Sequence, residues 1–359
     1  MKVNLKMLSE SLGLSQTTVS RALNGYSDVA EKTRHRVMEA ARSLGYQPDP
    51  LARRLATGRT DTIGLVFPFG ATEFGYHGFG EVVDGLTDGL ATHGIDLSII
   101  PIRPETELAT YRRLIDSRRV DALIVAWTRT RDARIDLLQE HKFPFLAYGR
   151  TMSQAPYPWF DFDNEAGARL AVERLLGFGH RRIGLIHPPL EFNFAAQRHA
   201  GYLAALRDAG INPDATLITQ SSLSRTGGYQ AMLDLLAGNN PPTALLIDNN
   251  LAGIGALRAL GDKGIQPGRD ISVIVYDGVS TDIPLPYKVT AVMQPTGTKS
   301  GRTMAQMVVA LLGGKSIANL QHLEQPCIEA GGTDGPFAAP QAPRLKARPK
   351  AAKVVSERD

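Results

Sequence analysis

The chain has 359 residues, which is more than one ordinary domain holds, so we expect two or three domains. Its 43% hydrophobic and 21% charged residues are typical of a globular protein, and residues 1–12 contain no unbroken apolar run that would act as a signal peptide or a membrane anchor. The single cysteine, Cys327, excludes a disulfide framework and a thiolate metal cluster within one chain. We therefore expect a cytoplasmic protein with no metal site and no cofactor.

The net charge of +4 is unevenly distributed along the chain. Residues 1–59 hold ten Lys and Arg against five acidic residues, and residues 337–359 hold six against two. The region between them is therefore net acidic. Basic ends on an acidic body suggest that the ends, rather than the body, meet a polyanion. For residues 337–359, which are rich in Ala, Pro and Lys, a basic disordered tail is the favoured interpretation.

Residues 1–47 contain three short helical patterns. The first ends at Gly13, the second begins with Ser15 as its N-cap and ends at Asn24, and the third ends before Gly45. Two short helices joined by a tight connection form a helix-turn-helix. The sequence therefore predicts a small all-α head that can bind DNA.

The second of these helices has an apolar face, with Val19 and Ala22, and a polar face opposite to it. In a major groove, Arg21 can donate two hydrogen bonds to guanine, Gln16 can pair with adenine, and the Thr17 methyl group can contact thymine. The alternative is a generic three-helix unit whose polar face is merely solvated. The candidate DNA contacts, some to bases and some to phosphates, are Ser15, Gln16, Thr17, Thr18, Ser20, Arg21 and Asn24.

The stretch LKMLSESLGLSQTTVSRALNG, followed by VAEKTRHRVMEAARSLGYQP, closely resembles the DNA-binding domain of the lactose-repressor (LacI/GalR) family. The hallmark Val-Ser-Arg-x-Leu-Asn-Gly begins at Val19, and the resemblance continues through the whole chain. It implies that Gln16, Thr17 and Arg21 occupy base-reading positions. Ala30 departs from the family, which often has Ser or Asn there, so the third helix lacks a side-chain cap and one turn is expected to fray.

Residues 48–60 form a basic linker in which Leu51 and Leu55 stand at helical spacing. The linker has room for about two turns of helix, which are unstable alone in water. The family resemblance implies a hinge helix that folds on DNA, pairs with its twin from a second subunit and inserts Leu55 into the minor groove, where an apolar side chain unstacks a base step. The alternative is a flexible tether whose leucines rest on the core.

From Thr62 onward, apolar strands alternate with amphipathic helical segments, which is typical of parallel sheets covered on both faces. About ten strands suit two doubly wound lobes better than one. The predicted fold is therefore α/β: a helix-turn-helix head followed by a core of two doubly wound parallel-sheet lobes. The family resemblance implies that this core is like the periplasmic binding proteins. With crossings expected near Asp163 and Tyr287, residues 61–162 and 288–325 form the N-terminal core lobe, and residues 163–287 and 326–336 form the C-terminal core lobe.

In open sheets of this kind a ligand binds beyond the carboxyl ends of the strands. Asp161, Asn249 and Asp277 end three of the predicted strands, and Arg198 is expected to open a helix. Carboxylate, amide and guanidinium groups can pair with the vicinal hydroxyls of a sugar. The family resemblance implies effector contacts for Arg198, Asn249 and Asp277. Asp163 and the Asn164 beside it are assigned to capping the helix that follows.

Aromatic residues near these positions are expected to cover the apolar face of a sugar ring. The candidates are Trp127 and Phe192, with Trp159 and Phe194 as further aromatic neighbours. The run LAYGRT and the general course of the sequence are similar to the α-glucoside-responsive members of the family. The predicted effector site therefore consists of Asp161, Arg198, Asn249, Asp277, Phe192 and Trp127.

No catalytic motif of the common kinds is found: HExxH and GxSxG do not occur, and GTKSG from Gly297 lacks the spacing of a phosphate loop. We therefore expect a transcriptional regulator and not an enzyme, and a repressor in particular. It would bind a near-palindromic operator as a homodimer, with its DNA affinity controlled by a small sugar-like effector. The alternative is a cytoplasmic sugar-binding protein or a sugar-acting enzyme with an incidental helical head.

Overall fold

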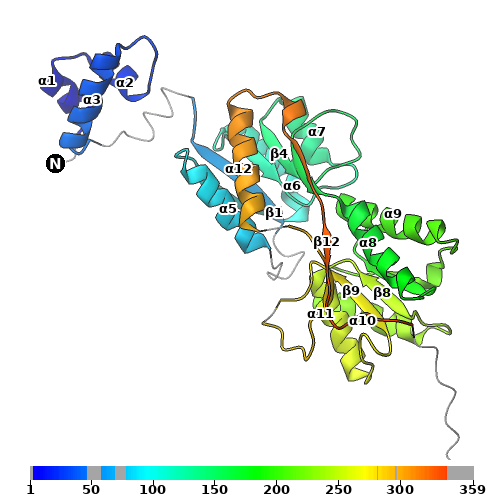
Figure 1. Ribbon diagram of the computed structural model, residues 1–359. Helices are drawn as coiled ribbons and strands as arrows, with labels where there is room; N and C mark the ends of the chain where they lie inside the picture. The colour runs from blue at the N-terminus through cyan, green and yellow to red at the C-terminus, as the bar shows by residue number, and fades with distance from the viewer. Residues whose placement is uncertain (1–2, 47–57, 69–77, 281, 296, 338–359) are drawn as a thin grey trace, which may run out of the picture.

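The structure is a computed structural model, in which residues 3–46, 58–68, 78–280, 282–295 and 297–337 are described (Figure 1). Most of the predicted hinge, Leu55 included, and the predicted tail beyond Phe337 lie outside these residues. The roles assigned to them above stay predictions.

The head contains the helices α1 (Leu5–Leu12), α2 (Gln16–Leu23) and α3 (Glu31–Ser43). Gly13, in the left-handed conformation, ends α1, and the Ser15 side chain accepts a hydrogen bond from the Thr18 amide at the start of α2, as predicted. Ala30 provides no side-chain cap, yet α3 begins directly after it at Glu31, so the expected fraying is not seen. The core of the head consists of the buried side chains of Leu8, Leu12, Val19, Ala22, Val29, Val37 and Ala41.

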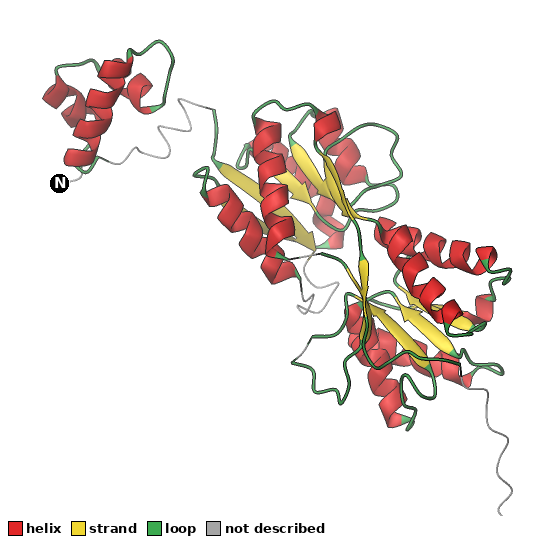
Figure 2. Ribbon diagram, in the orientation of Figure 1, coloured by secondary structure: helices red, strands yellow, loops and turns green. Residues whose placement is uncertain are grey.

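The core of the chain contains two six-stranded sheets, covered by helices (Figure 2). The first has the order β11-β5-β4-β3-β1-β2, with β1 (Thr62–Pro68), β2 (Asp96–Ile102), β3 (Ala122–Val125), β4 (Phe145–Tyr148), β5 (Trp159–Phe162) and β11 (Gln321–Glu324). The second has the order β12-β10-β9-β8-β6-β7, with β6 (Ile183–His187), β7 (Ile218–Gln220), β8 (Ala244–Ile247), β9 (Ser272–Tyr276), β10 (Thr290–Met293) and β12 (Cys327–Glu329). Among the described pairings only that of β10 with β12 is antiparallel.

Both faces of each sheet are buried under helices, which explains why the strands are near-continuously apolar. On the first sheet, one face packs against α5 (Phe79–Ala91) and α12 (Thr298–Leu312), and the other against α6 (Glu107–Ser117) and α7 (Ala133–Glu140). On the second sheet, one face packs against α8 (Asn164–Gly177) and α9 (Asn193–Asp208), and the other against α10 (Arg225–Ala237) and α11 (Asn250–Asp262).

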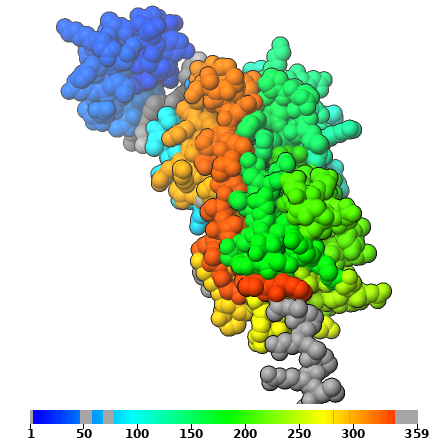
Figure 3. Space-filling model, turned by 45° about the vertical axis from the view of Figure 1, so that its right-hand side comes forward, coloured from blue at the N-terminus to red at the C-terminus, as the bar shows by residue number. Residues whose placement is uncertain are grey.

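The chain crosses between the lobes three times: between β5 and α8, between β10 and α12, and between β11 and β12. Figure 3 shows the last described segment running from one lobe to the other. The predicted return near Tyr287 is wrong, because β10 pairs with β9 in the second sheet and the chain returns only after Met293. The physical reason is that the described residues between β9 and β10 contain no helix and lead back into the same sheet, beside β9.

The predicted tail also begins one residue too early. The Phe337 amide donates a hydrogen bond to the Phe178 carbonyl, and the Phe337 ring lies 5.7 Å from that of His180. Phe337 therefore belongs to the C-terminal lobe.

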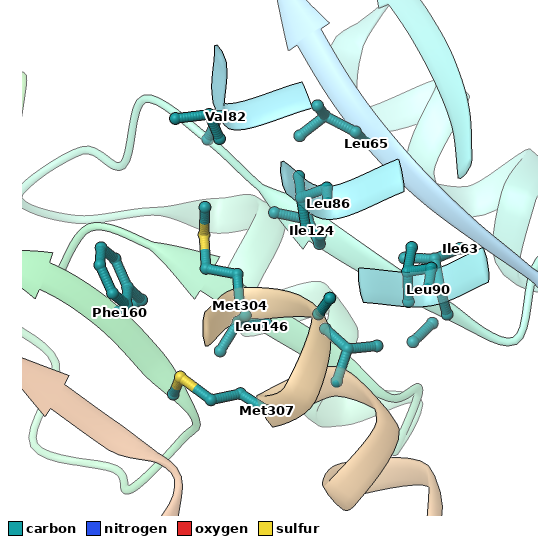
Figure 4. Packing of buried hydrophobic residues seen from close by; sticks show 14 of the residues in the cluster. Ile63, Leu65, Val82, Leu86, Leu90, Ile124, Leu146, Phe160, Met304 and Met307 are labelled. Carbon is teal, nitrogen blue, oxygen red and sulfur yellow. The ribbon is translucent and has the colours of Figure 1, made fainter. Parts of the chain in front are cut away.

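Helices α5 and α12 lie side by side over the first sheet because glycines let their backbones approach (Figures 1 and 4). A Cβ atom on Gly85 of α5 would lie 2.0 Å from the Thr298 carbonyl oxygen, and one on Gly301 of α12 would lie 2.2 Å from the Val82 carbonyl oxygen. Below this contact, Leu86 and its neighbours fill the core with side chains from the sheet, as Figure 4 shows. Close contact between the two backbones thus holds α5, from the first part of the lobe's sequence, against α12, from its last part.

We expect Gly85→Ala to lower the free energy of unfolding by about 1–3 kcal/mol, because the methyl group must push α12 away from its packed position. Gly80→Ala is the matched control on the same helix, since a Cβ there meets nothing within 4 Å. The control should leave stability unchanged or raise it by up to about 1 kcal/mol through better helix propensity. Urea unfolding followed by circular dichroism measures both, and equal effects of the two variants would contradict the packing argument.

Candidate DNA-binding and effector sites

The outer face of α2 carries the residues that the sequence predicts to read bases. Gln16, Thr17 and Arg21 are exposed, while Val19 and Ala22 on the opposite face are buried in the head. The buried face thereby holds α2 against the rest of the head, and the three polar side chains remain accessible on one surface. An exposed polar helix face of this kind fits a major groove.

The other predicted DNA contacts are partly engaged within the head. The Ser15 hydroxyl bonds to that of Thr18 at 2.8 Å and caps α2, and Asn24 Nδ2 donates to the Ser20 carbonyl at 2.9 Å. The side chains of Ser15, Thr18 and Asn24 therefore shape the two ends of α2, and Ser20 takes part through its backbone carbonyl. The other predicted contacts, Gln16, Thr17 and Arg21, take no part in these bonds.

Arg21 is held by a partner within the head. Its Nη2 lies 2.5 Å from Asp28 Oδ2, its Nε lies 3.2 Å from Asp28 Oδ1, and its guanidinium carbon lies 4.8 Å from the centroid of the Tyr26 ring. The fork that would pair with guanine is therefore occupied by a carboxylate. This pair must open before Arg21 reads a base.

We expect Asp28→Asn to tighten specific DNA binding by about 2- to 5-fold, because an exposed ion pair of up to about 1 kcal/mol no longer competes for Arg21. Glu10→Gln is the matched control, since it removes the same charge from an exposed side chain of the same head. Fluorescence anisotropy at fixed salt measures both variants. Equal gains would mean that only the general charge of the head matters.

A cavity between the two lobes brings most of the predicted effector residues together. Asp161 at the end of β5, Asn249 after β8 and Asp277 after β9 all line it, as does Trp127 after β3. Together with the solvent space at its open mouth, the cavity measures about 900 Å³. It therefore lies where open parallel sheets place their ligands, at the carboxyl ends of strands from both lobes.

Arg198 also lines the cavity, but it does not open a helix as predicted. It lies inside α9, which already begins at Asn193. Its Nη1 donates to the backbone carbonyl of Asp248 at 2.9 Å and to Asp248 Oδ1 at 2.5 Å, and its Nε donates to Asn164 Oδ1 at 2.9 Å. The guanidinium carbon lies 3.5 Å from the centroid of the Tyr276 ring, so two of the nitrogens and one face of the group are held.

The carboxyl groups of this wall are desolvated. Burial raises the pKa of Asp277 above its usual value, although the charge of Arg198 works in the opposite direction. Burial likewise raises the pKa of Asp248 to about 7, again against the charge and hydrogen bond of Arg198. Asp277 adopts the left-handed conformation with a φ of 63°, which an aspartate tolerates better than most residues. The turn after β9 thus brings its carboxylate to the cavity.

On the wall of the other lobe, Asp161 is paired with Arg150. Arg150 Nε donates to Asp161 Oδ2 at 2.8 Å, and the backbone amides of Arg150 and Phe162 donate to the same carboxylate. Burial nevertheless raises the pKa of Asp161, because desolvation exceeds the effect of Arg150. The sequence analysis missed Arg150, although it lies within the run LAYGRT that carried the resemblance to α-glucoside-responsive members.

Aromatic side chains form the remaining wall, in which Phe194 takes the place that the prediction gave to Phe192. Trp127 and Phe194 line the cavity, with ring centroids 6.0 Å apart, whereas Phe192 does not line it and stacks behind Phe194 at 5.7 Å. Phe192 begins α9 as its N-cap residue and therefore supports the wall from outside. Trp159 is also outside the cavity, because it starts β5 and Arg150 stacks on it at 5.3 Å.

The two lobes touch through their backbones beside the cavity. The Asn193 amide donates to the Thr128 carbonyl at 2.9 Å, and the Thr130 amide donates to the Glu191 carbonyl at 2.8 Å. Between these bonds, Arg129 and Phe192 form an isolated antiparallel bridge. Because Trp127 and Thr128 also line the cavity, a ligand that moves this wall acts directly on the contact between the lobes.

Three further residues around the cavity have roles that the sequence analysis did not assign. Asp163 caps α8 as predicted, but Asn164 does more: its Oδ1 accepts from Arg198 at 2.9 Å and from Gln294 at 3.0 Å, and its Nδ2 donates to Asp161 at 3.3 Å. Asn164 and Gln294 line the cavity, and Asp248 lies behind Arg198. The crossing segments thereby connect the polar walls of the two lobes.

Within the described part of the chain, no group of three or more His, Cys, Asp and Glu side chains is arranged to hold a metal ion. Among the same residues, no helix combines the length and apolar character that crossing a bilayer requires.

Comparisons with known proteins match both parts of the chain. Residues 60–326 match the family of periplasmic binding proteins and the sugar-binding domain of the LacI family, and residues 10–49 match the lacI family of bacterial regulatory proteins. The HTH-type transcriptional regulator RafR of Escherichia coli is 41% identical over 332 residues, which cover 92% of this chain and 98% of RafR.

Two solved structures are similar over nearly the whole chain. The lac repressor dimer bound to operator and the anti-inducer ONPF aligns with a TM-score of 0.76 at 26% identity, covering 93% of this chain and 100% of that one. The complex of the transcriptional regulator CelR with cellobiose aligns with a TM-score of 0.68 at 28% identity, covering 92% of this chain and 100% of that one. Head and core thus have counterparts in regulators that were solved with operator DNA and with cellobiose.

Proposed function

Because this chain belongs to the LacI family of bacterial transcriptional regulators, we propose that it is a repressor whose affinity for operator DNA is set by a sugar bound between its two lobes. One observation carries the proposal. A head with an exposed polar helix and a cavity lined by carboxylate, guanidinium, amide and aromatic groups occur on one chain. As a regulator of transcription it acts in the cytoplasm, where the DNA lies.

On DNA, Gln16, Thr17 and Arg21 read bases, and the ends of α2 contact phosphates. Two copies of the chain bind a near-palindromic operator, because each head covers one half-site and a two-fold axis relates the halves. The similarity to the lac repressor, solved as a dimer on its operator, supports this assembly. Leu55 in the hinge then enters the minor groove between the two half-sites.

In the cavity, the sugar hydroxyls pair with Asp161, Arg198, Asn249 and Asp277, and Trp127 covers the ring. The similarity to CelR, solved with cellobiose, supports a sugar as the ligand. The ligand is bound and released unchanged. Because both lobes supply these groups, ligand binding favours one arrangement of the lobes over another and thereby changes DNA affinity by a coupling free energy.

A gel shift with the DNA upstream of the chain's own gene, repeated across a panel of uncharged mono-, di- and trisaccharides, tests the function. We expect a shifted complex at low salt and its loss with one class of sugar. A chain that does not bind this DNA at low salt, or that binds it equally with every sugar, would contradict the proposal.

A further inference from the structure

Arg198 is a buried cation, and its charge is matched by the carboxylate of Asp248, which lies behind the cavity wall. The Arg198 side chain is 6% exposed and that of Asp248 is 1% exposed, and the two groups approach to 2.5 Å. The second oxygen of Asp248, Oδ2, is buried and has no hydrogen-bond partner among the described residues. The Asp248 carboxylate is therefore directed at Arg198 alone.

Three carboxylates and two guanidinium groups lie in the cavity wall or directly behind it. Asp161 is paired with Arg150, Asp248 with Arg198, and Asp277 lines the cavity with no side-chain hydrogen bond to the described part of the chain. Burial raises the pKa of all three carboxyl groups, so this environment already disfavours negative charge. A phosphate or a carboxylate brought into the cavity would add a further anion at the same place.

Arg198 would otherwise be a strong anion receptor. Its Nε and Nη1 are used by Asn164 and Asp248, while its Nη2 makes no hydrogen bond to described residues, and the residue lines the cavity. A guanidinium that is exposed to a ligand and not neutralised binds phosphate and carboxylate groups tightly. Whether the Nη2 edge of Arg198 binds an anion or a hydroxyl group therefore depends on the charge of Asp248 behind it.

We propose that Asp248 determines ligand specificity by neutralising Arg198, so that the cavity accepts uncharged sugars and rejects phosphorylated and carboxylated ones. Asp248 does not touch the ligand; it acts through Arg198. This inference rests on the proposed sugar-binding function. It adds that the sugar is uncharged and that the negative charge of Asp248 selects for this class.

Competition binding at pH 8, where the Asp248 carboxyl with its raised pKa of about 7 is mostly ionised, tests the proposal. The uncharged sugar identified by the panel is bound to the full-length chain, and inorganic phosphate, glucuronate and glucose 6-phosphate are added as competitors. We expect none of the three anions to displace it from the unaltered chain at concentrations at which glucose begins to compete. In Asp248→Asn, we expect the inhibition constant of inorganic phosphate to fall by at least about 10-fold, because the Arg198 charge is released.

Asp208→Asn is the matched control, because it removes the same charge from an exposed residue of α9, the helix that carries Arg198. It should leave phosphate competition unchanged. The proposal is overturned if phosphate competes equally with all three chains, or if Asp248→Asn loses the uncharged sugar without gaining phosphate. If no uncharged sugar binds the unaltered chain, the proposed function fails instead, and the two failures are distinguishable.

If Asp248→Asn unfolds below the assay temperature, the unaltered chain gives a second measurement. Glucosamine in its cationic form should then displace the bound sugar at least as well as glucose, and glucuronate should do so at least about 10-fold less well. The reverse order would overturn the proposal.

Discussion

Asp277→Asn is expected to bind the uncharged sugar about 10- to 100-fold more weakly than the unaltered chain. A hydrogen bond to a charged group contributes about 1.5–3 kcal/mol, and each 1.4 kcal/mol corresponds to a factor of ten in affinity. The Asp277 carboxylate lines the cavity and has no side-chain hydrogen bond to the described part of the chain, so we propose the hydroxyl groups of the ligand as its partners. Asparagine keeps the size of the side chain and tolerates the left-handed backbone at this position.

Isothermal titration calorimetry measures this loss, with Asp208→Asn as the control for a general change of charge. Operator binding without sugar should persist in Asp277→Asn, since Asp277 is remote in sequence from the head and its substitution leaves α2 unaltered. A variant that binds the sugar normally would exclude Asp277 from the contacts that we propose.

The same substitution should affect stability in the opposite direction. Burial raises the pKa of the Asp277 carboxyl above its usual value of 3.8, so the folded chain binds this proton more tightly than the unfolded chain. The contribution of this group to stability is therefore present below pH 3.8 and is lost as the pH rises through the folded-state pKa. In urea unfolding, the gain in free energy of Asp277→Asn over the unaltered chain should be larger at pH 8 than at pH 5.

A weaker ligand affinity combined with a more stable free protein separates a functional role from structural damage. Replacing a residue that only supports the fold would lower both the ligand affinity and the stability of the protein. Buried charge that is retained at a cost in stability is typical of binding sites.

The head was predictable because its signals are local. Gly13, Ser15 and the apolar spacing of α2 fix the helix ends and the buried face within a few residues of one another, and the structure has these features where the sequence places them. Asp161, Asn249 and Asp277 were also predictable, since the ends of parallel strands meet at one edge of a sheet.

The missed residues depend on contacts between segments that are far apart in the chain. Asn164 was assigned only to capping, yet it bonds to Arg198 and Gln294 because the crossing segments meet at the cavity. Asp248 stands beside the predicted Asn249, but its role follows from the orientation of Arg198 on α9. Periodicity gives the faces of each helix and strand, and not the partner that each side chain meets from the other lobe.

The wall of the cavity is also supported from behind by a buried charge network, and its central residue, Arg134, is expected to be important for stability. The Arg134 side chain is 1% exposed and donates to Asp132 Oδ2 at 2.6 Å and to Glu107 Oε1 at 3.0 Å. Its Nη2 also donates to the Trp127 carbonyl at 2.9 Å. Burial opposes ionisation of Asp132, but the hydrogen bond and the charge of Arg134 hold the pKa of that carboxyl below its usual value.

We expect Arg134→Met to lower the free energy of unfolding by about 3–5 kcal/mol, because it leaves the carboxylates of Asp132 and Glu107 buried without this cation. The Trp127 carbonyl loses its donor in the same step, and Trp127 holds a left-handed φ of 56° that surrounding contacts must maintain. We therefore also expect a shift in the tryptophan emission maximum and a weaker sugar affinity at temperatures where the variant is still folded.

Arg302→Met is the matched control, since Arg302 pairs with Asp88 at 2.7 Å while both side chains are 56% exposed. An exposed pair contributes about 0–1 kcal/mol, so urea unfolding should separate the two variants by several kcal/mol. If Arg134→Met is no less stable than Arg302→Met, the buried network does not support the cavity wall. If it is destabilised but leaves the tryptophan emission maximum and the sugar affinity unchanged, the network stabilises the lobe without positioning Trp127.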